Sequence, residues 1–134
     1  MTRVLALDYG SARCGCALSD PTGTLATPIE PVERPRTRKG MARVAGLVRA
    51  HAVSRVVVGL PLGLSGRDTP QTAEARAFAE RLAERLGDEV PVELYDERFT
   101  TRIAQRSGGS DASEDSRAAA VLLEDWLAAR ARGG

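Results

Sequence analysis

Aromatic side chains are scarce in this chain of 134 residues, which has one Trp, two Tyr and two Phe. Phe78 and Trp126 fall on predicted core stripes, so too few rings remain for an extended platform on which successive bases of a single strand stack. The chain also has only two cysteines and one histidine, His51. That supply excludes a zinc site built from Cys and His ligands.

Long apolar runs are missing as well. No stretch approaches the roughly 20 consecutive apolar residues of a membrane helix, and the N-terminus lacks a signal-peptide pattern. We therefore expect a cytoplasmic protein without a membrane partner. Cys14 and Cys16 point the same way on one strand, which favours reduced packing thiols and leaves a redox role open.

Excess charge of one sign is absent, because the formal net charge is +1. Binding of a nucleic acid would therefore need a local basic patch on the surface. The best candidate is the segment "ERPRTRKGMAR", in which Arg36, Arg38 and Lys39 surround a predicted helix start. Arg13 and Arg98 lie nearer the carboxylates described below and suit bidentate contacts with phosphate. A solvated basic loop is the alternative interpretation of the segment.

Apolar periodicity and turn residues predict the regular elements. Strands are expected at residues 3–8, 13–19, 24–34, 55–61 and 90–98, and helices at 37–50, 70–86, 100–106 and 112–131. Prolines within 24–34 favour an edge strand there, and the continuous run at 55–61 favours a central one. The order predicts a single α/β domain over residues 1–134. Its mixed five-stranded sheet, flanked by helices, is typical of the ribonuclease H-like fold.

Four acidic residues lie where such a fold gathers ligands. Asp8 ends the first strand, Asp96 and Glu97 end the last, and Asp115 lies four residues before the apolar Ala119. Three converging carboxylates would repel unless a divalent cation such as Mg²⁺ or Mn²⁺ joined them. Each acid alone has a simpler explanation: a turn, a pair with Arg98, or a helix-start acid. The pattern does not choose between Asp96 and Glu97.

Four segments, in order, resemble the YqgF/RuvX family: "LDYGSARCGCALSD", "VVVGLPLGLSG", "LYDERFTT" and "EDSRAAAVLLEDWL". The resemblance covers residues 3 to about 128. It implies a ribonuclease H-like fold and an acidic triad of Asp8, Glu97 and Asp115, which selects Glu97 over Asp96. It also implies a metal-dependent nuclease acting in 5′-end maturation of pre-16S rRNA, or on branched or single-stranded nucleic acid.

Three other functions compete with that interpretation. An actin-like ATPase would share the "DYGS" motif but needs two such domains, and this chain holds one. A Holliday-junction-type resolvase would use the same chemistry as a dimer, whereas we expect a monomer or weak homodimer. A non-catalytic RNA- or ribosome-binding factor would keep the fold without cleavage.

Overall fold

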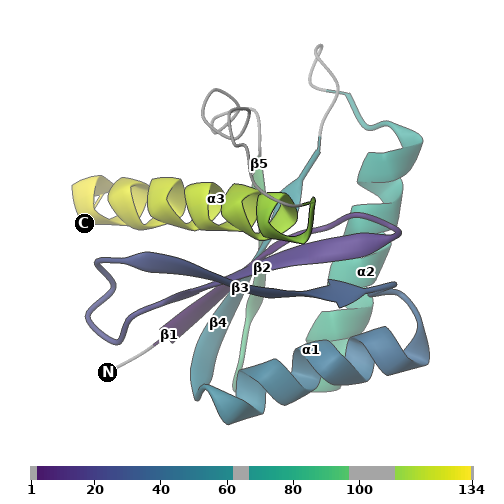
Figure 1. Ribbon diagram of the computed structural model, residues 1–134, viewed down its shortest axis with the longest axis horizontal. Coiled ribbons are helices and arrows are strands. Elements are labelled where there is room, and N and C mark those ends of the chain that lie inside the picture. The colour runs from purple at the N-terminus through teal and green to yellow at the C-terminus, as the bar shows by residue number, and fades with distance from the viewer. Residues whose placement is uncertain (1–2, 62–66, 97–110, 134) are drawn as a thin grey trace.

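The computed structural model describes residues 3–61, 67–96 and 111–133 of the chain (Figure 1). Within these residues, five strands and three helices follow one another along the sequence. They are β1 (Arg3–Asp8), β2 (Arg13–Ser19), β3 (Ala26–Glu33), α1 (Arg38–Ala50), β4 (Val53–Leu60), α2 (Pro70–Leu86), β5 (Val92–Asp96) and α3 (Asp111–Gly133). The predicted helix at 100–106 lies outside the described residues.

The strands form one mixed sheet in the order β3-β2-β1-β4-β5. The first three strands pair antiparallel, and β1, β4 and β5 pair parallel, so the predicted mixed five-stranded sheet is confirmed. β3 is an edge strand, as its prolines Pro28 and Pro31 indicate, because proline cannot donate to a sheet ladder. The apolar run at β4 is central and buried.

Helices cover both faces of the sheet: α3 lies on one side, and α1 and α2 lie on the other (Figure 1). Side chains alternate along each strand, so one set packs against α1 and α2 and the other against α3. Leu5 and Leu7 of β1 belong to the larger cluster with Phe78 of α2. Ala6 belongs to the smaller cluster, with Trp126 of α3. The fold therefore has two apolar layers, one on each face of the sheet.

The helix termini follow the expected capping chemistry. The Thr37 hydroxyl accepts a hydrogen bond from the Gly40 amide at the start of α1. Thr69 and Thr72 form a capping box around Pro70 at the start of α2. Gly87 ends α2 with a φ of 79°, a conformation that suits glycine. None of the described helices is long and apolar enough to cross a membrane.

The turn between β2 and β3 is closed by Asp20. Its carboxylate accepts hydrogen bonds from the amides of Thr24 and Leu25, at 2.7 and 2.8 Å, and from the Thr22 hydroxyl. These bonds hold the pKa of the Asp20 carboxyl well below its ordinary value, with the Thr22 hydroxyl as the largest cause. Because this turn uses residues 24 and 25, β3 begins two residues later than the sequence predicts.

We expect Asp20→Ala to lower the free energy of unfolding at neutral pH. A depressed folded pKa stabilises the protein above the unfolded value of about 3.9, and this contribution is lost as the pH falls through the folded value. The difference between variant and wild type should therefore shrink below about pH 4. Urea unfolding across a pH series measures it, with Asp88→Ala in the exposed turn after α2 as the control. A difference that stays constant with pH would contradict this assignment.

Candidate active site

Asp8 ends β1 with its side chain on the face that α3 covers. Alternation along β1 determines this, because Leu7 packs in the cluster under α1 and α2 while Ala6 packs under α3. The carboxylate is half-buried and takes part in polar interactions. The charge that ends this apolar strand thus lies at the sheet–helix boundary.

Gly15 brings Asp8 and Asp115 to the same place. It is the β2 residue directly opposite Asp8, so the two positions share a face of the sheet. A Cβ at Gly15 would lie 1.9 Å from the carbonyl oxygen of Asp115, so helix α3 rests on the bare backbone of β2 there. Asp8 and Asp115, more than 100 residues apart in sequence, therefore both lie next to Gly15.

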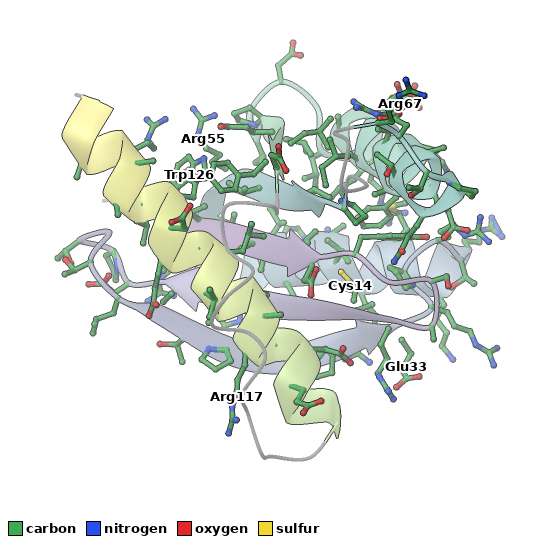
Figure 2. All side chains as sticks on the ribbon, turned by 90° about the horizontal axis from the view of Figure 1, so that it is seen from above. Cys14, Glu33, Arg55, Arg67, Arg117 and Trp126 are labelled. Atoms are coloured by element: carbon green, nitrogen blue, oxygen red, sulfur yellow. The ribbon has the colours of Figure 1, made fainter. Side chains whose placement is uncertain are left out.

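Asp8 and Asp115 both lie close enough to the buried thiol of Cys14 to affect its pKa. Its pKa is raised well above the ordinary value, first by its contact with the Cys16 thiol and then by burial. The negative charges of Asp8 and Asp115 raise the pKa further. Both cysteines are free and fully buried on the side of α1 and α2, as packing thiols are. Figure 2 shows Cys14 near the middle of the molecule.

Arg13 contacts the carboxylate of Asp115 directly. Its Nε lies 3.0 Å from Oδ2, and both side chains are somewhat more than one-third exposed. The sequence suggested Arg13 as a phosphate contact, and the structure places it beside one of the predicted metal ligands. A guanidinium in this position offsets part of the repulsion between carboxylates. Its partial exposure leaves it within reach of a ligand from solvent.

Side chains along β5 alternate between the two faces of the sheet. Glu93 accepts a hydrogen bond from the Trp126 indole, and Tyr95 donates one to Asp125, so both face α3. Figure 2 shows Trp126 and Arg55 near each other beside α3. Asp96 pairs with Leu60 and points to the opposite face, away from Asp8.

Glu97 and Arg98 lie outside the described residues. Among the residues that the structure describes, no three Asp, Glu, His or Cys side chains form a group that could hold a metal ion. The described part of the site consequently offers two of the three predicted carboxylates. Oxygen donors of this kind fit Mg²⁺ or Mn²⁺.

The basic segment after β3 forms a pocket of about 410 Å³. It is lined by Glu33, Arg34, Thr37, Lys39, Gly40 and Arg43. Arg38 is exposed at the first position of α1. Arg36, in contrast, has its guanidinium 3.2 Å from the Glu74 carboxylate, which also accepts a bond from Tyr9. The predicted contacts are therefore not equivalent, because Arg36 already has an ionic partner.

The pocket adjoins the carboxylate site through the backbone. Arg13 pairs with Glu33 across β2 and β3, and the Arg34 amide donates to the Ala12 carbonyl at 2.9 Å. Arg34 has a φ of 43°, which is uncommon for a residue with a side chain. These contacts link Asp115, through Arg13 and its strand partner Glu33, to the basic pocket.

Ser116 was not among the residues singled out from sequence. It is 2% exposed and lies next to Asp115, three residues before Ala119 and seven before Leu123 on the buried stripe of α3. A serine on an apolar helical stripe is a usable signal, because a buried hydroxyl needs hydrogen-bond partners. Gly15 was missed as well, since nothing local in the sequence reveals which helix crosses it.

The sheet order and helix placement define the class as ribonuclease H-like. Solved structures agree: RuvC of Thermus thermophilus in complex with a Holliday junction substrate superposes with a TM-score of 0.61 at 17% identity, covering 98% of this chain and 97% of that one. The fowlpox virus Holliday junction resolvase superposes with a TM-score of 0.55 at 12% identity, covering 96% and 99%. The predicted fold is confirmed.

The chain belongs to the RuvX family, described as Holliday junction resolvase, whose model matches residues 2–129. Curated relatives carry the name of pre-16S rRNA nucleases. A protein of Mycobacterium leprae is 46% identical over 133 residues, which cover 93% of this chain and 72% of that protein. A protein of Anaeromyxobacter is 44% identical over 137 residues, covering 96% and 98%. The resemblance seen in the four sequence segments is confirmed.

We expect Gly15→Ala to destabilise the protein by about 1–3 kcal/mol, because the new methyl group collides with the backbone of α3. Gly46→Ala is the matched control, since a Cβ there meets nothing within 4 Å. Alanine inside α1 should instead raise stability by up to about 1 kcal/mol. Thermal and urea unfolding of both variants measure the contrast. Equal effects of the two substitutions would contradict the close approach of α3 to β2.

Proposed function

We propose that this protein is a metal-dependent nuclease that hydrolyses phosphodiester bonds in the 5′-end maturation of pre-16S rRNA. The observation that carries the proposal is the meeting of Asp8 and Asp115 beside Gly15, at the C-terminal edge of β1. Membership of a nuclease family and the names of the curated relatives support the same chemistry and substrate.

Asp8, Glu97 and Asp115 are the proposed catalytic residues and metal ligands. Asp8 and Asp115 share the α3 face, and side chains of β5 alternate so that Glu93 and Tyr95 reach this face while Asp96 does not. This facing disfavours Asp96 as the third ligand, and the family resemblance of the "LYDERFTT" segment favours Glu97. Bound by these carboxylates, Mg²⁺ or Mn²⁺ would activate a water molecule and neutralise the departing oxygen of the phosphodiester.

Arg13 has two proposed roles at this centre. In the ligand-free protein its guanidinium neutralises part of the charge of Asp115 at 3.0 Å. When substrate arrives, the half-exposed fork can turn to a phosphate oxygen, for which its geometry is suited. The residue thus holds the carboxylate in place before binding and orients the substrate afterwards.

The nucleic acid would run from the carboxylates over Arg13 to the pocket at the start of α1. Lys39, Arg38 and Arg43 supply positive charge along this path, while Arg36 contributes less because Glu74 already neutralises it. Contacts of this kind position the backbone without reading sequence. Arg98 follows the proposed ligand Glu97 in sequence and is assigned to the phosphate by the same logic as Arg13.

A junction resolvase is the second candidate, because the family model carries that description. Resolution needs two active sites acting on two strands, whereas we propose a cytoplasmic monomer or weak homodimer acting on RNA. Solution mass together with cleavage of a four-way DNA junction and of a precursor rRNA fragment distinguishes the two. A stable dimer that cuts only the junction would replace the rRNA proposal, and binding without any cleavage would favour a non-catalytic RNA-binding factor.

We expect Asp8→Asn to reduce metal-dependent cleavage by roughly 100-fold or more, because metal assistance is worth several kcal/mol in the transition state. The variant should also lose the rise in Tm that Mn²⁺ gives to the wild type, since binding to the folded state alone stabilises it. Cleavage of a precursor rRNA fragment and thermal melts with and without Mn²⁺ are the measurements.

Asp125→Asn is the matched control for Asp8→Asn. It also removes a carboxylate from the α3 side of the sheet, but at the Tyr95 hydroxyl, about three turns beyond Asp115. This variant should cleave and bind Mn²⁺ as the wild type does. If Asp8→Asn were as active as the wild type in Mn²⁺, the nuclease mechanism proposed here would be wrong.

For the basic pocket, we expect Lys39→Ala to weaken binding of a short single-stranded RNA. Each lost phosphate contact should lower the slope of log K against log salt by about 0.7. Arg36→Ala should change the slope less, because the Glu74 ion pair competes for the guanidinium. Arg49→Ala, at the other end of α1, is the control. Binding titrations at several salt concentrations measure the slopes. If Arg49→Ala lowered the slope as much as Lys39→Ala does, the proposed path of the nucleic acid over the pocket would be wrong.

A further inference from the structure

The ladder between β2 and β3 is interrupted beside the proposed catalytic site. Cys14 pairs with Val32, but Cys16 pairs with Ile29, so Gly15 alone faces two residues of β3. One of those two is Pro31, which has no backbone N–H to donate. Such a bulge leaves backbone groups of both strands without their regular partners.

The hydroxyl of Ser116 fills this gap. The amide of Cys16 donates to Ser116 Oγ at 3.2 Å, and Oγ in turn donates to the carbonyl oxygen of Ile29 at 2.5 Å. A helix side chain thus completes a hydrogen-bond path between two strands. Because Ser116 is 2% exposed, water cannot easily replace it, and loss of the hydroxyl would leave a buried donor and a buried acceptor unpaired.

The hydrogen bonds of Ser116 also restrain Asp115, the residue before it in the chain. A Cβ at Gly15 would lie 1.9 Å from the Asp115 carbonyl oxygen and 2.9 Å from the Ser116 amide nitrogen, so the peptide unit joining them lies directly against β2. The hydrogen bonds of the Ser116 hydroxyl attach this part of α3 to β2 and β3, and the missing side chain of Gly15 lets the helix backbone approach β2. The backbone of α3 at Asp115 is therefore held against Gly15, the β2 residue opposite Asp8.

We propose that Ser116 is a positioning residue, whose hydroxyl sets the separation between the Asp8 and Asp115 carboxylates and so the affinity for a divalent cation. The inference rests on the proposed function, since it assumes that these two acids bind the ion. Ser116 itself touches neither ion nor substrate. Groups that orient a metal ligand commonly change metal affinity by about 10- to 100-fold when removed.

Ser19 provides a matched control within the same strand pair. It is also 2% exposed, and its hydroxyl accepts the amide of Val4 at 2.9 Å. It lies at the opposite end of β2 from Arg13 and Asp115. Ser19→Ala therefore removes a buried hydroxyl that bonds to a strand amide, without touching the segment that carries Asp115.

The test is calorimetric titration of the nucleic-acid-free protein with Mn²⁺, with unfolding measured in parallel. We expect Ser116→Ala to raise the Kd for Mn²⁺ by about 10-fold or more. Ser19→Ala should lose stability, yet keep its Kd within about twofold of the wild type, because distant sites act independently. Ser116→Thr retains the hydroxyl and should keep most of the affinity.

A second variant, Gly15→Ala, displaces the same segment without removing a polar group, so it should weaken Mn²⁺ binding even if Ser116→Ala does not fold. Wild-type affinity in folded Ser116→Ala or Gly15→Ala would overturn the positioning role while leaving the proposed function intact, provided that Asp8→Asn loses binding. Equal weakening by Ser19→Ala would also overturn it. A wild type that binds no Mn²⁺ would remove the proposed function and this inference together.

Discussion

The candidate site depends on one close approach, that of helix α3 to the backbone of β2 at Gly15. A helix normally packs on a sheet through side chains, but here the Asp115 carbonyl occupies the space where a Cβ would be. This contact brings the backbone of Asp115, far along the sequence, beside the β2 residue that lies opposite Asp8, the last residue of the first strand. The site would not exist if α3 were held one side chain further away.

Two acids close together repel each other, and the helix that carries one of them must be held in place. The described residues meet both needs. Arg13 places its guanidinium on Asp115, which lowers repulsion in the ligand-free protein. The hydroxyl of Ser116 satisfies the interrupted ladder, so the helix is held by hydrogen bonds as well as by the apolar stripe around Trp126. The same few residues thus stabilise the fold and would hold two acids of the proposed divalent-ion centre in place.

The basic pocket extends this arrangement along the edge of the sheet. β3 is an edge strand interrupted by Pro28 and Pro31, and its end leads into the unusual backbone of Arg34 and then into α1. Glu33 lines the pocket and lies opposite Arg13 in the sheet, so the pocket adjoins the residue that contacts Asp115. Under the proposed function, a phosphate backbone lying there would meet cations along its length and the proposed metal-binding carboxylates at the point of cleavage.

Local chemistry determined much of this protein from sequence alone: the strand periods, the threonine caps, the edge position of the proline-containing strand, and the acids at strand ends. These features depend only on residues close together in the chain, so local sequence patterns predict them. The partner of Arg13, the ionic contact of Arg36, the glycine beneath α3 and the bonds of Ser116 were decided by tertiary structure. Each is a contact between segments far apart in sequence, and its geometry follows from strand register and helix docking, which no local pattern specifies.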